Sequence, residues 1–347
     1  MTDATGGRLL VTGATGFLGR RQVRRLLDGG WSVRALLRPG TDPASVPEWA
    51  EDLASGRLEV AHASFSDAGQ LRSALDGIRV VLHLAASKSG SAAAQVANTV
   101  VGSEQLYQAS LAAGTSRFVL VSSFGVIGAS QVARGGLIDE QVPMEAQAER
   151  RDPYSFAKHR QEALAWKYHR ERGLPLVVVR PGAVFGPGGS IMGPRIGLRL
   201  FGLFLHLGGG CTLPLTYVDN CADAIVQAGV VPGIEGETFC VVDDDLPTSR
   251  QVLRRYRREV APIGFVPVPF FALRQLAGVN EWYSAKTSNH LPAVFTPYKV
   301  DAMWKGHRYS NAKAKARLQW SPRIPMDDAI GIALRALAAS SGGRHGA

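Results

Sequence analysis

The chain has 347 residues, 46% of them hydrophobic and 20% charged, which is ordinary for a globular protein with an ample core. Its formal net charge of +10 does not indicate a nucleic-acid-binding protein, because the arginines are spread through every segment without a basic and aromatic stripe. The charge is compatible with an anionic small-molecule ligand.

The cysteines and the first residues bear on the cellular compartment. Cys211, Cys221 and Cys240 have no metal-ligand spacing, so we expect free, buried thiols in a reducing environment. Residues 1–7 are small and polar, without a hydrophobic signal core. We therefore expect a cytoplasmic protein without a structural disulfide.

Strands and helices alternate along the first half of the chain. Residues 8–12 predict a short apolar strand that runs into a glycine-rich turn, and residues 17–27 predict a helix that stops at Gly29. We expect further strands at 31–37, 58–63, 80–85, 118–122 and 176–180, and helices at 68–75 and 92–113. This alternation predicts an α/β fold with a doubly wound parallel sheet of the Rossmann type.

The pattern changes after Pro181. Residues 191–207 are almost wholly apolar but too short to span a membrane once Arg195, Arg199 and His206 are counted. We expect a buried helix or a lid there, with contact to a membrane surface as the alternative. Residues 216–230 and 237–242 predict a helix and a strand that return to the main sheet. An arginine-rich helix is expected to begin near Thr248 or Ser249.

This pattern divides the chain into two regions. We expect a dinucleotide-binding Rossmann domain over residues 8–185, to which 216–245 return. A smaller, mostly C-terminal substrate-binding region is expected over 186–215 and 246–335.

The glycine-rich turn carries the first functional signal. Gly13, Gly16 and Gly19 follow a predicted strand and open a helix, which is typical of a turn that binds the pyrophosphate of a dinucleotide at a helix amino end. The second strand ends in Arg38, with no carboxylate before Asp42 to bond a ribose hydroxyl. Arginine at this place favours the 2′-phosphate of NADP over NAD, unless Arg38 is simply a surface residue.

Tyr154 and Lys158 carry the second signal. They are one helical turn apart and share a face, so the ammonium can lower the pKa of the phenol. Such a tyrosine can give or take the proton of a secondary alcohol or ketone. Together with the glycine turn, this pair predicts a hydride-transferring enzyme, which needs no metal.

These motifs resemble the extended short-chain dehydrogenase/reductase family, which contains nucleotide-sugar epimerases and dehydratases, 3β-hydroxysteroid dehydrogenases and dihydroflavonol reductases. The resemblance covers nearly the whole chain. It rests on TGATGFLG (12–19), HLAA (83–86), VSSFGVIG (121–128), YSFAK (154–158), RPGAVFGPG (180–188) and YVDNCADAI (217–225).

The resemblance implies roles at the matching positions. Tyr154 would be the general acid/base, and Lys158 would hold the nicotinamide ribose and lower the pKa of Tyr154. Ser123 would bond the substrate oxygen with Ser122 as its supporting neighbour, and the family suggests a homodimer. The implied cofactor contacts are Gly13, Thr15, Gly16, Phe17, Leu18, Gly19, Arg38, Leu84, Ala85, Ala86, Lys158 and Pro181.

The chain departs from the family pattern at two places. The family often has an asparagine three residues before a glycine, whereas here Thr99 precedes Gly102 at that spacing, with Asn98 adjacent. Ser64 stands where the family usually has an aspartate that contacts adenine. His83 lies beside the expected cofactor, but a structural histidine is favoured there.

The reaction type is left open between three alternatives. The apolar residues 208–215 lack the basic or polar stretch with which nucleotide-sugar enzymes grip a diphosphate, which favours a dehydrogenase or reductase acting on a less polar substrate. Arg195, Ser123 and Tyr154 are candidate substrate contacts. The arginines Arg195, Arg199 and Arg250 leave an epimerase or dehydratase with retained NAD as the alternative. A regulator that binds NADP without catalysis is disfavoured by the intact Ser-Tyr-Lys set.

Overall fold

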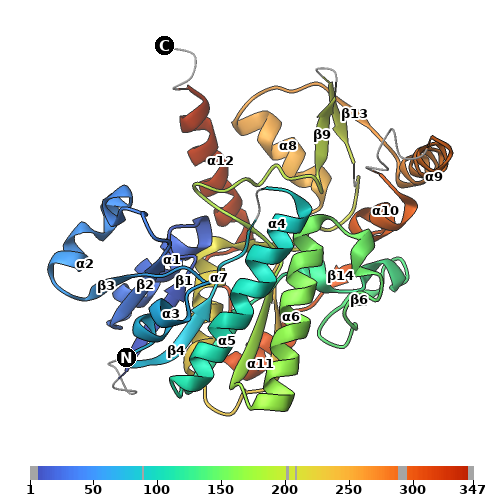
Figure 1. The fold of residues 1–347 in the computed structure, drawn as a ribbon. Helices are drawn as coiled ribbons and strands as arrows, with labels where there is room; N and C mark the ends of the chain where they lie inside the picture. The colour runs from blue at the N-terminus through green and yellow to red at the C-terminus, as the bar shows by residue number, and fades with distance from the viewer. Residues whose placement is uncertain (1–6, 88–89, 201–202, 208, 288–294, 343–347) are drawn as a thin grey trace.

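The computed structural model describes residues 7–87, 90–200, 203–207, 209–287 and 295–342. These residues build a central sheet of seven parallel strands in the order β12-β7-β5-β4-β1-β2-β3 (Figure 1). The strands are β1 (Arg8–Thr12), β2 (Val33–Leu37), β3 (Leu58–His62), β4 (Ile78–His83), β5 (Arg117–Val121), β7 (Leu176–Pro181) and β12 (Glu237–Val241). The strand order reverses between β1 and β4, where an open α/β sheet forms its ligand crevice.

Helices cover both faces of this sheet, which explains why β5 and β7 are buried along their whole length. On one face pack α1 (Phe17–Asp28), α7 (Val218–Val230) and α11 (Ala312–Leu318). On the other pack α3 (Ala68–Ala74), α5 (Gly102–Ala112) and α6 (Pro153–Arg172). Figure 1 shows α5 and α6 side by side across the front of the sheet. The doubly wound Rossmann prediction is confirmed.

The helix expected over residues 92–113 is not uniform. It consists of α4 (Ala92–Val96), a π-helical turn over Ala97–Val101, and α5. A π-helical turn accommodates one residue more than an α-helical turn, and such turns recur at functional sites. It contains both Asn98 and Thr99.

Helix α6 begins where the local sequence requires it. The carboxylate of Asp152 accepts a hydrogen bond from the backbone N–H of Ser155 at 3.0 Å, and Pro153 fills the first helical position, where no N–H is needed. This cap fixes the start of the helix immediately before Tyr154.

The buried helix predicted within residues 191–207 is wrong. The segment forms two antiparallel strands, β9 (Gly197–Leu200) and β10 (Leu203–His206), and β13 (Phe265–Pro267) pairs in parallel with β10. Gly193 and Pro194 break any helix before β9. A Cβ at Gly197 would lie 2.2 Å from the carbonyl oxygen of Leu205, so the two strands approach too closely for a side chain there.

Two other predicted helices are present, one of them with a shifted start. The predicted helix over 216–230 begins at Val218, because residues Leu215–Tyr217 form β11, which pairs with β8 (Ala183–Phe185). The arginine-rich helix α8 (Ser249–Glu259) begins as predicted, with Thr248 and Gln251 forming a reciprocal capping box.

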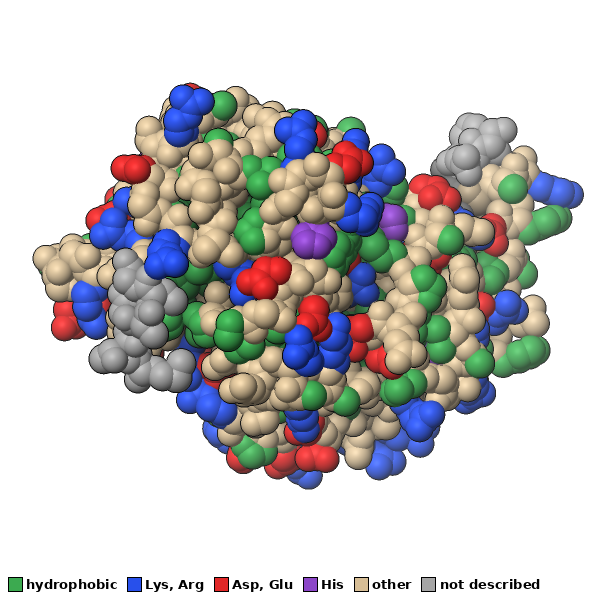
Figure 2. Space-filling view, turned by 90° about the horizontal axis from the view of Figure 1, so that it is seen from below, with side chains coloured by type: hydrophobic (Ala, Val, Ile, Leu, Met, Phe, Trp, Pro, Cys, Tyr) green, Lys and Arg blue, Asp and Glu red, His purple; other side chains and the backbone are tan. Residues whose placement is uncertain are grey.

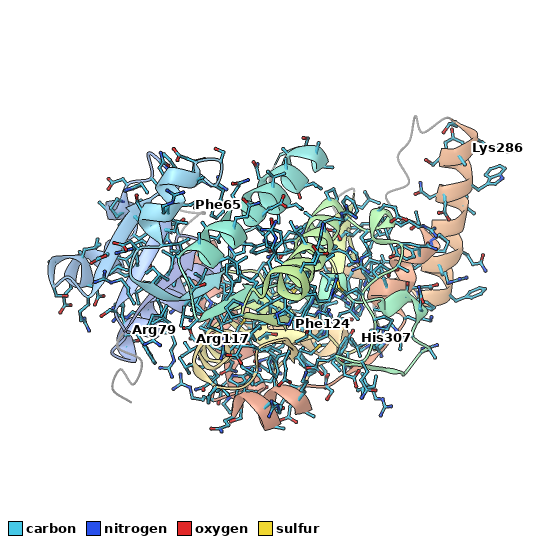
Figure 3. The ribbon with its side chains drawn as sticks, turned by 60° about the horizontal axis from the view of Figure 1, so that its bottom comes forward. Phe65, Arg79, Arg117, Phe124, Lys286 and His307 are labelled. Atoms are coloured by element: carbon cyan, nitrogen blue, oxygen red, sulfur yellow. The ribbon has the colours of Figure 1, made fainter. Side chains whose placement is uncertain are left out.

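The C-terminal part contributes α9 (Phe270–Lys286), α10 (Pro297–Trp304), α12 (Met326–Gly342), and β14 (Arg308–Tyr309), which pairs with β6 (Leu137–Ile138). Helix α9 stands at the edge of the molecule and packs Leu273 and Ala277 against α10 (Figure 3). Its other side exposes Phe271, Leu276, Val279, Trp282 and Tyr283. Among the described residues, no helix has the length and hydropathy of a membrane span.

The surface charge agrees with the sequence. On the face drawn in Figure 2, lysine and arginine side chains are scattered among acidic and apolar ones rather than gathered in one stripe. The three cysteines are free thiols; Cys221 and Cys240 are buried as predicted, whereas Cys211 is only half-buried.

Asn220 joins the C-terminal region to the sheet. Its Nδ2 donates to Asp243 Oδ2 at 3.1 Å and to the carbonyl oxygen of Ile324 at 2.9 Å. Its Oδ1 accepts from the backbone N–H groups of Arg323 and Ile324, both at 3.1 Å. Asp243 also accepts from the N–H of Tyr217 at 2.9 Å, so one buried amide and one buried carboxylate hold three chain segments together.

Candidate active site

A cavity of about 1940 Å³ runs along the carboxyl ends of the sheet strands. Its lining reaches from the glycine turn, past the ends of β2 and β3, to α6 and α10. Phe65, which follows β3, and Phe124, which follows β5, both belong to the lining (Figure 3). Every cofactor, catalytic and substrate residue predicted from the sequence lines this one cavity.

The glycine turn fits a pyrophosphate. Gly13 has a φ of 69°, and a Cβ there would lie 2.9 Å from the backbone nitrogen of Ala85. Glycine is therefore needed both for the left-handed backbone and for close contact with the 84–86 loop. No side chain caps the amino end of α1, which leaves its backbone N–H groups available to an anion in the cavity.

Arg38 lies exposed at the end of β2 and lines the same cavity. The nearest following carboxylate, Asp42, accepts a hydrogen bond from the N–H of Ala44 at 2.9 Å and so caps its own turn. Ser64 also lines the cavity, with its hydroxyl 2.7 Å from that of Ser66. This end of the cavity offers a cation and hydroxyls, which suits a phosphate group.

Tyr154 and Ser123 meet at the centre of the cavity. The pKa of Tyr154 is raised to about 12, mainly by burial and in smaller part by the charge of Asp152, while a hydrogen bond with Ser123 opposes the rise. The direction is opposite to the one that the Tyr154–Lys158 spacing predicts. In this structure the phenol therefore keeps its proton at neutral pH.

Lys158 is buried and belongs to the same cavity lining. Its Nζ donates to the carbonyl oxygen of Val121 at 2.7 Å and to Gln161 Oε1 at 2.9 Å. Val121 lines the cavity at the end of β5, whereas Gln161 is fully buried outside the lining. The ammonium is thus held by strand β5 and by its own helix.

Ser122, the supporting neighbour, is tied to a buried ion pair. Its hydroxyl donates to Glu162 Oε2 at 2.5 Å, and Glu162 accepts from Arg180 Nη2 at 2.5 Å and Nε at 3.1 Å. Because Glu162 is on α6 and Arg180 on β7, the pair joins the helix of Tyr154 to the sheet. Ser123 is free of this pair and faces the cavity.

Asn98 and Thr99 take different sides of the π-helical turn. Asn98 lines the cavity, whereas Thr99 is buried and accepts a hydrogen bond from the N–H of Ser87 at 3.1 Å. The residue at the family spacing is therefore structural, and its neighbour is the one that reaches the site.

His83 is a buried structural residue, as the sequence favoured. Burial and the charge of Lys158 lower its pKa to about 3, so its imidazole is neutral. Its Nδ1 lies 2.7 Å from Thr12 Oγ1, and its Nε2 lies 2.8 Å from Ser103 Oγ.

At the substrate end, Arg195 is the only one of the three candidate arginines in the cavity lining. Its Nη1 donates to the carbonyl oxygen of Met303 at 3.0 Å, so it also ties this loop to α10. Arg199 and Arg250 lie exposed on the surface, outside the lining.

Sequence reasoning missed two cations of the lining, Arg151 and Lys299. Arg151 lies three residues before Tyr154, which is a signal that could have been used. Lys299 comes from the C-terminal region, where no pattern pointed to the site. The remaining lining at this end is mostly apolar and includes Ile191, Ile196, Leu213, Leu215 and Met303.

A model of the NAD dependent epimerase/dehydratase family matches residues 9–232. The chain belongs to this family. The match confirms the resemblance to extended short-chain dehydrogenases/reductases, and with it an enzyme of that type. NAD dependence is the property of the family, and the preference for NADP stays a prediction.

Curated relatives of this family member include two 3β-hydroxysteroid enzymes. The chain is 26% identical over 350 residues to 3beta-hydroxysteroid-dehydrogenase/decarboxylase isoform 2 of Arabidopsis thaliana. This alignment covers 92% of the chain and 60% of that protein. It is 32% identical over 195 residues to 3 beta-hydroxysteroid dehydrogenase/Delta 5-->4-isomerase of Mycobacterium tuberculosis H37Rv, which covers 54% of the chain and 49% of that protein.

Solved structures share the fold over the whole chain. The crystal structure of gox2253 has a TM-score of 0.78 at 25% identity and covers 98% of this chain and 99% of its own. UDP-glucuronic acid 4-epimerase from Bacillus cereus, in complex with NAD, has a TM-score of 0.70 at 20% identity and covers 96% and 99%. The second likeness concerns the fold alone.

Proposed function

We propose that the protein is a nicotinamide-dependent dehydrogenase/reductase that interconverts a secondary alcohol and a ketone on a largely apolar substrate. The observation that carries the proposal is the hydrogen-bonded pair of Tyr154 and Ser123, which lines the same cavity as the glycine turn. A non-catalytic regulator would need the turn but not this pair.

The cavity lining indicates how a dinucleotide would be held. The N–H groups at the amino end of α1 would bind the pyrophosphate, and Arg38 would pair with a 2′-phosphate, which favours NADP. The loop of Leu84, Ala85 and Ala86 lies beside the turn and would contact the dinucleotide, and Lys158 would hold the nicotinamide ribose. When bound, the nicotinamide supplies or accepts the hydride.

The chain's own residues would handle the oxygen and its proton. The hydroxyl of Ser123 would hold the substrate oxygen, and Tyr154 would donate its phenol proton to that oxygen during ketone reduction. The raised pKa of Tyr154 supports the proton-donating role at neutral pH. In alcohol oxidation the phenolate oxygen of Tyr154 would accept the proton of the substrate hydroxyl, which requires the positive charge of Lys158 to stabilise the phenolate.

The substrate end supports an apolar alcohol over a sugar nucleotide. Ile191, Ile196, Leu213 and Met303 line it, and Arg195 is engaged with the carbonyl oxygen of Met303. The names of the two hydroxysteroid dehydrogenases among the relatives agree with this class. We therefore propose a fused-ring or similarly bulky secondary alcohol as the substrate class.

A nucleotide-sugar epimerase is the alternative, favoured by the cations Arg151, Arg195 and Lys299 in the lining. The two reactions differ in their use of cofactor. A dehydrogenase changes the near-ultraviolet absorbance of nicotinamide in proportion to product, whereas an epimerase retains NAD and leaves the absorbance unchanged. Turnover of UDP-sugars without a net absorbance change would replace our proposal with the alternative.

The test of the acid/base role is Tyr154→Phe, with Tyr168→Phe as the matched control. Tyr168 is on the same helix but bonds Glu104 and Gln108 outside the cavity. With a panel of hydroxysteroids and aromatic alcohols, we expect Tyr154→Phe to lose turnover on the order of 100-fold or more while still binding NADP(H), and the control to keep it. Near-normal turnover by Tyr154→Phe would remove Tyr154 from the mechanism.

A further inference from the structure

Beneath the cavity, a closed group of polar side chains joins α6 to β4 and β1. Lys158 donates to Gln161 Oε1 at 2.9 Å, and Gln161 Nε2 lies 2.6 Å from Ser103 Oγ and 3.0 Å from His83 Nε2. His83 in turn reaches Thr12, whose hydroxyl accepts from the N–H of Ala85 at 3.2 Å. Each of these five side chains is at most 2% exposed.

The orientation of the Gln161 carboxamide is determined by its neighbours. Ser103 donates its own proton to the carbonyl oxygen of Thr99 at 2.5 Å, so toward Gln161 its hydroxyl acts as an acceptor. The nitrogen of the carboxamide must therefore face Ser103, and the oxygen must face Lys158. A flipped carboxamide would set two donors against each other at Lys158.

This arrangement controls the direction of the ammonium. The carbonyl oxygen of Val121 and Gln161 Oε1 each take one N–H of Lys158, so two of its three N–H directions are set by the protein and the third follows. His83 adds no competing charge, because its imidazole is neutral. A lysine on a flexible four-carbon side chain needs such acceptors to hold one position.

We propose that Gln161 is a positioning residue: it fixes the ammonium of Lys158 and, through Lys158, governs proton transfer at Tyr154. The inference rests on the proposed function. Nothing in the YSFAK motif predicts it, because Gln161 lies beyond the motif and its partners outside α6 come from β4 and α5. A structural filler at this position would affect stability alone.

The pH profile of alcohol oxidation distinguishes the two roles. The reaction needs the Tyr154 phenolate, which a well-placed ammonium stabilises. Loss of the Gln161 acceptor removes one of the hydrogen bonds that orient the ammonium, so the phenolate loses stabilisation and the midpoint of the acid limb moves to higher pH.

The experiment uses the full chain with Gln161→Met, which keeps the side-chain length without an acceptor, and Gln161→Glu, which keeps an acceptor oxygen. Arg160→Gln, on the exposed side of the same helix, is the control. We expect Gln161→Met to lower kcat on the order of 10- to 100-fold and to move the midpoint upward by about one pH unit. Gln161→Glu should lie closer to the wild type, and the control should match it.

A second measurement is independent of activity and of cofactor. Urea unfolding of Gln161→Met, Lys158→Met and the double variant forms a double-mutant cycle. We expect Gln161→Met to cost stability in the wild-type background and clearly less where Lys158 is already methionine. Ser103→Ala, which frees the carboxamide to flip, should move the pH midpoint in the same direction by a smaller amount.

The outcomes separate this inference from the function. An unchanged pH midpoint in Gln161→Met, or additive stabilities in the cycle, would overturn the positioning role even if Tyr154→Phe is inactive. An active Tyr154→Phe would instead overturn the proposed function, and the cycle would still decide whether Gln161 holds Lys158.

Discussion

Asn98 and Thr99 are neighbours in the chain, yet Asn98 lines the cavity while Thr99 is turned inward to accept the N–H of Ser87. The π-helical turn over Ala97–Val101 accounts for this relationship. The turn accommodates one extra residue before Gly102. Asn98, four positions before Gly102, therefore lies on the face that the residue three positions before Gly102 would occupy in an α-helix.

The different roles of Asn98 and Thr99 can be tested by substituting each residue separately. We expect Asn98→Ala to lower turnover by about tenfold or more with an unchanged free energy of unfolding. Thr99→Val should do the reverse and cost about 1–3 kcal/mol of stability, because the N–H of Ser87 loses its acceptor. Turnover and urea unfolding of both variants check this, and the opposite pattern would return the cavity role to Thr99.

Arg38 should decide between the two dinucleotides. Removal of a charge-assisted hydrogen bond to a 2′-phosphate costs about 1.5–3 kcal/mol, which is on the order of 10- to 100-fold in affinity. We therefore expect Arg38→Leu to weaken NADP binding by this factor and to leave NAD binding nearly unchanged. Fluorescence titration measures both, with Arg72→Leu, exposed on α3 and outside the cavity, as the control. Equal losses for both dinucleotides would count against a phosphate contact.

Removal of one partner of the buried Glu162–Arg180 pair should lower the free energy of unfolding more than removal of both partners. Glu162→Ala leaves the guanidinium buried without its carboxylate, and we expect a loss of about 3–5 kcal/mol. The double variant Glu162→Leu/Arg180→Met removes both charges and should recover much of this loss. Thermal and urea unfolding test the pair, and a double variant no more stable than Glu162→Ala would contradict the argument.

Asp243 should make stability depend on pH. Burial raises its pKa to about 7 from an ordinary value of 3.8, although the N–H of Tyr217 and the amide of Asn220 both lower it. Between these pH values the folded state binds a proton that the unfolded state has released. The contribution of Asp243 to the free energy of unfolding therefore falls as the pH rises from about 4 to 7.

Asp243→Asn removes that titration. We expect the variant to lose the part of the pH dependence that falls in this window, so its stability relative to the wild type should improve from pH 4 to pH 7. Urea unfolding at several pH values compares the two proteins. Parallel stability curves for both would show that Asp243 does not titrate there.

The fold was largely predictable because its signals are local. Strand β7 opens with a continuous apolar run before Arg180, and Gly13, Gly16 and Gly19 can be recognised from their spacing. The helix prediction for residues 191–207 was wrong for a related reason. Its apolar residues suit a buried helix as well as a hairpin, and only the contact of Gly197 with Leu205 selects the hairpin.

The site was predictable where a motif carries it, as at Ser123, Tyr154 and Lys158. Two features depend on contacts between distant parts of the chain and were missed. Lys299 reaches the cavity from α10, and Gln161 meets His83 and Ser103 across three elements. The pKa of Tyr154 also depends on burial, which the spacing to Lys158 does not reveal.

The small sheet of β9, β10 and β13 has a consequence for engineering. Its strands come from two stretches of the chain that α7, β12 and α8 separate, and β10 pairs with both. A chimera with a single crossover would therefore set β10 of one parent against β13 of the other. Recombination of specificity between relatives requires two matched junctions, one on each side of the segment that completes the Rossmann sheet.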